Sequence, residues 1–346
     1  MKKIFLLGLS FLVTGVLVYY LLTRSYWTDW QRILLHLKPG YLVWYLFLYA
    51  IGLLLRTFRY HFLLKSVKTP VLPSFWNLTL VTSVRNMLVD FLPARTGSLS
   101  YIVLLNGAFK VDLSPCLTSF TYSFLFDLLA MAPLLAVALL VDSLTSGKSF
   151  FWLWGIAIVI LVISLTLILF LGPLVKIFSQ WSGRIEHRWP KYSWLRPLDQ
   201  QLHTLSQSFS TLKQVPIFWP TLGLSVLIRA IKYLYLYILL AAVLQALSGQ
   251  GIHLPFWMVF LGLVGSEAAA GLPISGIAGF GFYEGVLGAV LSSQGIDPSQ
   301  AVLVSFAMHL LTQIIDYSLG GGALVYLLIR WAGRKEKEKK ISNIFN

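Results

Sequence analysis

The chain has few charged residues and a single cysteine. Asp, Glu, Lys and Arg make up 12% of its 346 residues, about half the share found in an ordinary soluble domain. This composition excludes a large water-facing domain as the main part of the protein. Cys116 has no second cysteine for an intramolecular disulfide and no metal ligands at a recognisable spacing. We therefore expect no disulfide, no metal and no cofactor.

Long apolar runs take the place of the missing charges, because 57% of the residues are hydrophobic. Several runs reach the roughly 20 residues that a helix needs to cross the hydrocarbon core of a bilayer. They are continuous rather than alternating, which disfavours a membrane β-barrel. The sequence predicts an all-α, polytopic membrane protein with about six full transmembrane helices and two re-entrant helical hairpins. The spans are expected at 4–22, 41–63, 117–141, 150–177, 216–247 and 300–329.

The two hairpins are expected where apolar stretches are interrupted by helix breakers. Residues 74–107 contain charged residues around Pro93, and residues 255–292 contain Pro273 and several glycines. Proline and glycine end or bend helices, and non-helical backbone at membrane depth is tolerated inside the protein rather than against lipid. Each stretch is therefore interpreted as a re-entrant hairpin.

The basic residues are gathered in a few patches. The formal net charge is +14, from 27 Lys and Arg against 13 Asp and Glu. The whole excess lies in the two N-terminal lysines, residues 56–68, residues 176–213 and residues 330–346. The positive-inside rule places these patches in the cytoplasm, so we expect a bacterial inner-membrane protein with both termini cytoplasmic. Residues 23–40 disagree with this topology, since they would be external yet carry three bases and one acid. No nucleic acid partner is needed to explain the charge.

Residues 178–215 and the basic tail 331–346 are the polar segments of the chain. Between Leu195 and Leu212, hydrophobic residues recur at steps of three and four, which indicates one apolar stripe on a helix. This helix either lies along the membrane surface or packs on the cytoplasmic loops of the protein.

Two of the expected spans carry nearly the same polar signature. The sequence LRTFRY at 55–60 resembles IRAIKY at 228–233, with an aliphatic residue, Arg, two other residues, a base and Tyr. Each copy is followed by a Leu-Pro break, at 92–93 and 272–273, with glycine a few residues later. The same series of features thus occurs twice.

A span with an aspartate, Asp127 or Asp316, follows each break. Three crossings in each half would turn the second copy upside down, so one transmembrane domain is expected to hold inverted repeats at about 1–145 and 146–330. Transporters built this way bind substrate at the repeat interface, beside broken helices. Chance similarity between two hydrophobic sequences is the alternative.

Basic residues three positions apart lie on one helical face. The pairs Arg56/Arg59 and Arg229/Lys232 therefore each form a cationic cleft suited to a phosphate. Snorkelling of these side chains to the nearest headgroups is the alternative. In the second hairpin, the carboxylates of Glu267 and Glu284 either pair with bases of this kind or bind protons. The proposed substrate-binding residues are Arg56, Arg59, Arg85, Asn86, Arg95, Arg229, Lys232, Glu267 and Glu284.

Arg85 and Arg95 belong to the first hairpin, where Asp90 is an alternative partner for either of them. His309, Gln313 and Asp316 share one face of the last span at steps of four and three. They form either a polar track that relays protons or a self-satisfied core cluster. Asp127 is the lone acid of its span and is expected to face the same interior.

The two breaks resemble those of a known family. LPARTG at 92–97, LPIS at 272–275 and GFGFYE at 279–284 are similar to motifs of the lysylphosphatidylglycerol synthase transmembrane-region family of flippase-like proteins. The resemblance extends loosely over nearly the whole chain and implies a role in lipid translocation. The residues that match family positions are Arg95, Gly97, Asp127 and Glu284. The chain departs from the family pattern at Ser98, Tyr101 and Ser123-Phe124, where charged residues are usual.

Full-length lysyltransferases of this kind add a soluble catalytic domain, and the stretch 178–215 is too short to be one. Nucleotide-binding, zinc and nucleophile-elbow motifs are also absent. We predict a lipid flippase or transporter, rather than an enzyme, for an anionic phospholipid or a polyprenyl-phosphate-linked lipid. One alternative is an intramembrane lipid-modifying enzyme with Glu284 or the His309/Asp316 pair as acid and base. The other is a non-catalytic membrane partner of a lipid or envelope glycan synthase.

Overall fold

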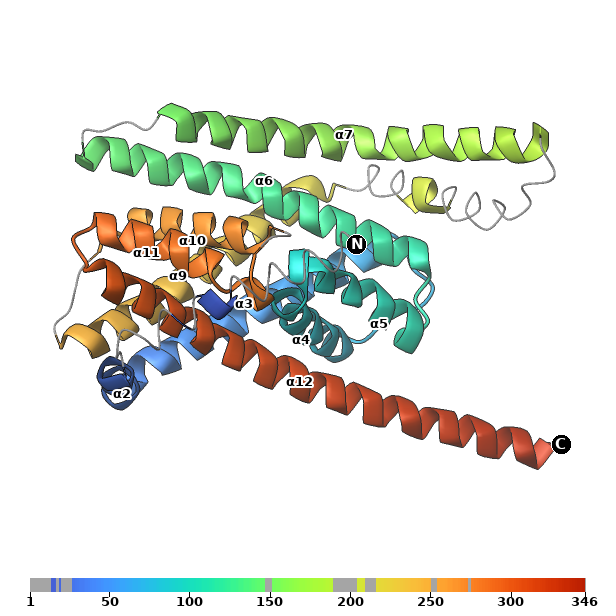
Figure 1. The fold of residues 1–346 in the computed structure, drawn as a ribbon. Coiled ribbons are helices and arrows are strands. Elements are labelled where there is room, and N and C mark those ends of the chain that lie inside the picture. Colours follow the sequence, from blue (N-terminus) through green and yellow to red (C-terminus); the bar gives the residue numbers. More distant parts are fainter. Residues whose placement is uncertain are drawn as a thin grey trace. The chain divides into compact units, whose positions relative to one another are not determined.

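In the computed structural model, the described part of the chain is almost entirely helical (Figure 1). It describes residues 14–16, 19, 27–146, 151–188, 204–208, 216–249, 254–272 and 275–345. About 89% of the structure is helical, and the described residues form no strand. The all-α class predicted from the apolar runs is confirmed.

Four helices in the described part of the chain are long and apolar enough to cross a membrane. They confirm the spans predicted at 41–63, 117–141, 216–247 and 300–329, and the protein is therefore a multi-pass membrane protein. These helices are α3 (Pro39–Ser66), α6 (Leu113–Ser146), α9 (Phe218–Ser248) and α12 (Pro298–Phe345).

Of the other two expected spans, one lies on a described helix and the other is almost entirely outside the described residues. The span predicted at 150–177 lies on α7 (Phe151–Arg188), which includes the shorter apolar stretch Ala157–Phe170. The span predicted at 4–22 falls almost entirely outside the described residues, as does most of the apolar stripe 195–212. Within that stripe the structure describes residues 204–208, which are helical. A helix that the sequence did not predict, α2 (Trp27–His36), lies within the connection 23–40.

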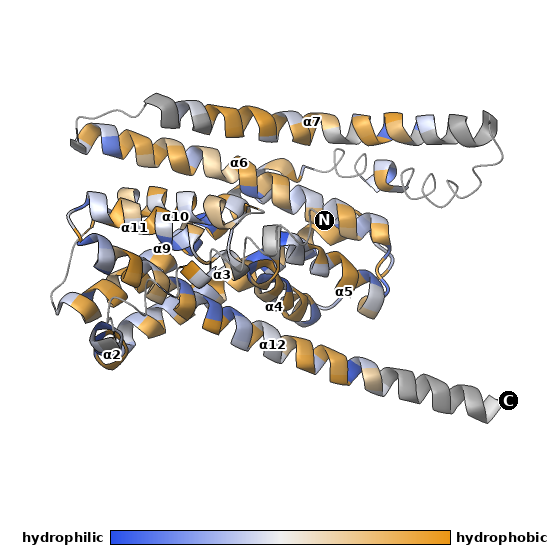
Figure 2. Ribbon diagram, viewed as in Figure 1, coloured by the Kyte–Doolittle hydropathy of each residue, from blue (hydrophilic) through white to orange (hydrophobic). Residues whose placement is uncertain are grey.

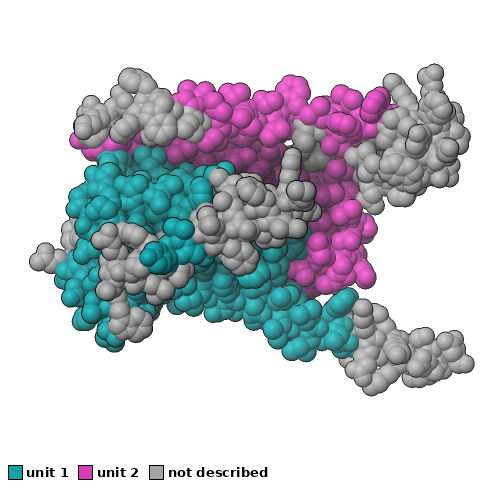
Figure 3. Space-filling view, viewed as in Figure 1, with its two compact units in different colours: residues 1–52, 80–100, 231–346 teal, residues 53–79, 101–230 magenta. Residues whose placement is uncertain are grey.

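The chain divides into two compact units that alternate along the sequence (Figure 3). Unit 1 comprises residues 1–52, 80–100 and 231–346, and unit 2 comprises residues 53–79 and 101–230. Both α3 and α9 therefore contribute one part to each unit. The inverted repeats at 1–145 and 146–330 stay a prediction.

The core of unit 2 is formed by hydrophobic side chains from α3, α6 and α7. The helices α6 and α7 pack against each other, and hydrophobic residues cover much of both (Figure 2). Tyr60 of α3 stacks on Tyr101 of α5 (Ser100–Phe109), with ring centroids 4.2 Å apart. Between membrane-spanning helices, van der Waals packing of such side chains is one of the forces that hold the helices together. The buried cluster consists of Leu63, Val67, Tyr122, Leu125, Phe126, Leu129, Ile168 and Ile217.

In unit 1, the second interrupted stretch is a helical hairpin. Its arms are α10 (Phe256–Ala270) and α11 (Phe282–Ser293), joined through the short helix η3 (Ile277–Gly279). The two arms pack side by side. Their 15 and 12 residues extend about 22 and 18 Å at 1.5 Å per residue, which is short of a hydrocarbon core about 30 Å thick. The arms are thus too short to be full crossings.

The first interrupted stretch is also broken where the sequence predicts. The helix α4 (Phe75–Phe91) ends just before Pro93, and the short helix η1 (Pro93–Leu99) follows. Gly97 lies so close to α4 that a β-carbon there would be 1.7 Å from the carbonyl oxygen of Leu88. Within unit 1, η1 contacts η3, so the breaks of the two interrupted stretches meet.

The helix α12 packs against α11 in unit 1. It also approaches α4 closely at Gly320, where a β-carbon would lie 2.4 Å from the β-carbon of Met87. Phe306 of α12 contacts Trp30 of α2 edge to face, with centroids 5.5 Å apart. These contacts fix the face of α12 that carries His309, Gln313 and Asp316.

Candidate functional site

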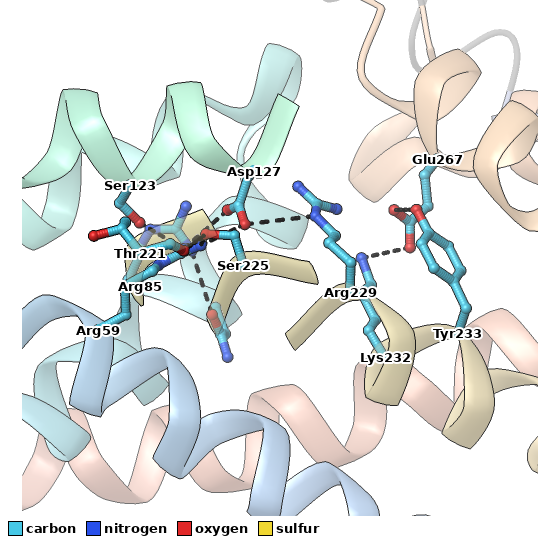
Figure 4. A network of polar contacts seen from close by, with 11 residues as sticks. Arg59, Arg85, Ser123, Asp127, Thr221, Ser225, Arg229, Lys232, Tyr233 and Glu267 are labelled. Carbon is cyan, nitrogen blue, oxygen red and sulfur yellow. Dashed lines mark hydrogen bonds and ion pairs between the residues drawn. The ribbon is translucent and has the colours of Figure 1, made fainter. Parts of the chain in front are cut away.

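The centre of unit 2 holds a buried ion pair between α3 and α6. Nη1 of Arg59 lies 2.7 Å from Oδ1 of Asp127, and Nη2 lies 3.1 Å from Oδ2. The Arg59 side chain is 0% exposed and the Asp127 side chain 14% exposed. The same two nitrogens donate to the hydroxyls of Ser225 and Ser123, each at 2.6 Å. Arg59 is thus held on both sides of its guanidinium (Figure 4).

Two further arginines of unit 2 act on the same carboxylate. Nε of Arg229 in α9 lies 3.6 Å from Oδ1 of Asp127, and the charge of Arg56 also acts on Asp127. The Arg229 side chain is 18% exposed, and Arg56 is half-buried. The structure therefore brings Arg59 and Arg229 to Asp127, and the charge of Arg56 acts on the same carboxylate.

In unit 1, the hairpin acid Glu267 pairs with Lys232, as one of the alternatives from the sequence anticipates. Nζ of Lys232 lies 2.5 Å from Oε1 of Glu267, and the Tyr233 hydroxyl donates to Oε2 at 3.3 Å. Both side chains of the ion pair are largely buried, at 21% and 13% exposed. Figure 4 shows this pair with its tyrosine.

Arg95 lies at the end of α10, where the last carbonyl groups of the helix point. Its Nη2 donates to the carbonyl oxygen of Glu267 at 2.8 Å, and a cation is favoured at a helix C-terminus. Arg95 itself has a φ of 54°, a left-handed conformation that is uncommon for residues with a β-carbon. The charges of Arg95 and Lys232 both act on Asp90. The predicted residues Arg95, Lys232 and Glu267 therefore gather around the meeting point of the two breaks, together with Asp90.

Arg85 and Asn86 lie on α4, and Nη1 of Arg85 is 3.5 Å from Oδ1 of Asn86. Asn86 also interacts with Tyr49 of α3. The Tyr49 hydroxyl donates a hydrogen bond to Asp316. Asp316 is thus bonded to α3, through a tyrosine that also interacts with α4. The other two residues of its predicted track have different partners.

Glu284 pairs with His309 rather than with Arg229 or Lys232, which the sequence left open as its partners. Oε1 of Glu284 lies 2.6 Å from Nδ1 of His309, and the Glu284 side chain is 0% exposed. Oε2 accepts a hydrogen bond from the backbone N–H of Gly281 at 2.5 Å. The buried carboxylate is therefore satisfied on both oxygens.

His309 and Gln313 are in contact, as their spacing predicts. Nε2 of His309 lies 2.9 Å from Nε2 of Gln313, and the same Gln313 nitrogen donates to the carbonyl oxygen of Ala278 at 3.0 Å. The proton-relay role of His309, Gln313, Asp316 and Asp127 stays a prediction. Asp127 belongs to unit 2 and the other three to unit 1.

Several hydroxyl partners were missed by the sequence reasoning. Ser123 precedes Asp127 by one helical turn, and residues four apart on a helix are neighbours, so this spacing was available as a signal. Ser225 and Tyr49 had no comparable signal, because each bonds a residue on another helix. Tyr233 is the last residue of the repeated signature at 228–233, but no partner was predicted for it. The part of the chain that the structure describes contains no cluster of three His, Cys, Asp or Glu residues suited to a metal ion.

An all-α chain with apolar spans and buried ion pairs beside broken helices belongs to the polytopic membrane proteins. Within this class, the family model described as "Lysylphosphatidylglycerol synthase TM region" matches residues 6–320. The chain therefore belongs to this family, as the breaks of its two interrupted stretches predicted. Comparison with curated proteins and with solved structures gives no match. The family description points to a membrane protein with a lipid-related function.

Proposed function

We propose that the protein is a lipid flippase or transporter that translocates an anionic phospholipid or a polyprenyl-phosphate-linked lipid. Two partly buried arginines beside the Arg59–Asp127 pair carry the proposal. The Arg229 guanidinium lies 3.6 Å from Asp127 and its side chain is 18% exposed, and the half-buried Arg56 acts on the same carboxylate. Arginines within membrane-spanning helices mark substrate pathways, and the guanidinium group is suited to an anionic headgroup.

The four side chains have different tasks in this proposal. Arg59 and Asp127 form the framework, because Arg59 is fully buried and engaged with Asp127 and two serines. Arg229 meets Asp127 at a longer distance and is partly exposed. Its planar guanidinium is suited to binding two phosphate oxygens at once. Arg229 and Arg56 are therefore the residues that we expect to contact the headgroup.

The breaks in unit 1 supply the second part of the proposal. Transporters often place substrate beside broken helices, where the end of each half-helix can bind an ion. Arg95 and Lys232 lie at such a place in unit 1. We propose that they attract the headgroup during transfer, with Glu267 and Asp90 limiting how tightly it is held. Arg85 and Asn86, which are polar residues of the same unit, remain among the proposed substrate-binding residues.

The test is lipid translocation by the purified protein in reconstituted vesicles. Labelled phosphatidylglycerol, a labelled polyprenyl phosphate and labelled phosphatidylcholine are supplied in one leaflet, and their appearance in the other leaflet is followed. We expect faster transfer of an anionic lipid than in empty vesicles. Arg229→Gln should slow this transfer by about tenfold, which corresponds to one lost charge-assisted contact. Lys65→Gln, at an exposed position of α3, is the matched control and should leave it unchanged.

Absence of transfer above empty vesicles for every anionic lipid would reject the proposal. Equal slowing by Arg229→Gln and Lys65→Gln would reject the assigned site. Chemical conversion of the lipid without transfer would instead support an intramembrane enzyme.

We also propose a bacterial inner membrane with both termini in the cytoplasm, on the basis of the basic patches. Labelling of single cysteines placed at the two ends, in a Cys116→Ala background, tests this orientation.

A further inference from the structure

A closed series of hydrogen bonds in unit 1 ties the break of the second hairpin to α12. It runs from the N–H of Gly281 to Glu284 at 2.5 Å and from Glu284 to His309 at 2.6 Å. It continues from His309 to Gln313 at 2.9 Å and from Gln313 to the carbonyl of Ala278 at 3.0 Å. The series therefore begins and ends on the same turn, residues 278–281, and passes through two side chains of α12.

The chemistry of these groups fixes the proton on His309. The Ala278 carbonyl only accepts hydrogen bonds, so the Gln313 atom that faces it must be the amide nitrogen. That nitrogen only donates, and His309 Nε2 must then accept from it. The proton of neutral His309 consequently lies on Nδ1 and is donated to Glu284. All groups in the series are satisfied only when His309 carries this single proton.

The turn that the series holds has an unusual backbone conformation. Ala278 has a φ of 56° and a ψ of 21°, in the left-handed region that residues with a β-carbon rarely adopt. Such a conformation persists only when surrounding contacts hold it. The Gln313 bond to the Ala278 carbonyl is one of these contacts, and η3 also touches η1 of the first break.

We propose that His309 is a proton-binding site, and that a second proton on its ring releases the turn 278–281. The proton would come from water and add to Nε2, which then becomes a donor facing the donor nitrogen of Gln313. The Gln313 amide must rotate to present its oxygen instead. Its nitrogen then leaves the carbonyl of Ala278, and the left-handed residue loses a partner. The turn 278–281, which lies beside the break of the first interrupted stretch, becomes free to rearrange.

The groups around His309 are compatible with a positive charge on the ring. From α11, Glu284 bonds the ring and Tyr283 stacks on it, with centroids 4.3 Å apart. From α4, the carboxylate of Asp90 interacts with His309. Phe280 of the turn also packs on the His309 ring, with ring centroids 4.5 Å apart. From α3, Tyr49 bonds Asp316 further along α12. Glu284 and Asp90 are thus two acidic residues that interact with His309.

Amide hydrogen exchange of the turn tests this site in the full chain. The N–H groups of Gly279 and Gly281 are bonded to the Gly276 carbonyl and to Glu284 in the closed turn. Exchange is compared at about pH 8 and about pH 5, and corrected for the intrinsic pH dependence. We expect the corrected exchange of these two amides to be about three- to tenfold faster at the lower pH, as one lost hydrogen bond implies.

Two variants and a control make the test specific. His309→Gln cannot take the second proton and should remove the pH difference. Gln313→Met cannot bond Ala278 and should give fast exchange at both pH values, so it tests the site even where His309→Gln fails to fold. His61→Gln, at a histidine of α3 in unit 2, should keep the wild-type difference.

The proposal would be overturned by a pH difference that persists in His309→Gln or Gln313→Met, or by its absence in the wild type. Release of the turn by protonation of His309 does not rest on the proposed function. Vesicles that transfer no lipid at either pH would reject the proposed function and leave release of the turn standing. Exchange of the turn that does not depend on pH, together with normal lipid transfer, would reject release of the turn and leave the proposed function standing.

Discussion

Replacement of Asp127 by asparagine should strongly destabilise unit 2. The substitution keeps the shape of the side chain but removes the negative charge that faces Arg59 at 2.7 and 3.1 Å. The new amide group also places a donor nitrogen against one of the guanidinium nitrogens. Because the Arg59 side chain is 0% exposed, water cannot take over the role of the carboxylate. Breaking a buried pair in this way costs about 3 to 5 kcal/mol.

A second variant separates the cost of an uncompensated charge from the net value of the pair. Arg59→Met combined with Asp127→Leu removes both charges and fills the space with apolar groups. Such replacements of buried pairs are often neutral or stabilising, so the double variant should be within about 1 to 2 kcal/mol of the wild type. Arg229 loses the same ionic partner in Asp127→Asn, so the comparison of the two variants takes this loss into account.

The free energy of unfolding is measured by SDS titration in mixed micelles, for both variants and for Asp112→Asn. Asp112 is exposed at the start of α6, and aspartate and asparagine serve equally well beside a helix N-terminus, so this control should change stability little. A loss below about 1 kcal/mol for Asp127→Asn, the range of a surface pair, would refute the buried framework. A double variant as unstable as Asp127→Asn would show that the serines and the pair act as one unit.

The same titration tests the two breaks. Gly97→Ala places a β-carbon 1.7 Å from the Leu88 oxygen and should cost about 3 kcal/mol or more. Gly107→Ala meets no atom within 4 Å and should stabilise α5 by up to about 1 kcal/mol; similar losses at both glycines would contradict the close approach. Ala278→Gly should stabilise the left-handed turn by about 1 kcal/mol, whereas Ala241→Gly inside α9 should lose about as much. Destabilisation by Ala278→Gly would show that the conformation of that residue is not strained.

The helices and their breaks could be predicted because they depend on local sequence. Continuous apolar runs predicted the four spans that the structure confirms. Pro93 and the glycines after Pro273 marked the two breaks. The helix α2 was missed because its ten residues mix aromatic, charged and aliphatic side chains and read as a polar connection. Its contact with α12 through Trp30 gives it a partner that no local pattern reveals.

The partners within the candidate site could be predicted only in part. Lys232 and Glu267 were among the expected pairs, since opposite charges at membrane depth tend to meet. Asp127 was not assigned to Arg59, which lies 68 residues away along the chain. That pairing depends on the relative rotation of α3 and α6. In the same way, the bond from Glu284 to His309 depends on how the second hairpin returns to α12.

The contact between the two helix breaks also determines where a transmembrane voltage would act. The arms α10 and α11 extend only about 22 and 18 Å, and charged side chains lie at the breaks. Polar groups at membrane depth raise the local dielectric constant, so the electric field concentrates in the apolar layer that remains. A singly charged headgroup crossing the whole field would gain or lose about 2.3 kcal/mol for each 100 mV. Under the proposed function, the direction of lipid movement is therefore expected to respond to the membrane potential.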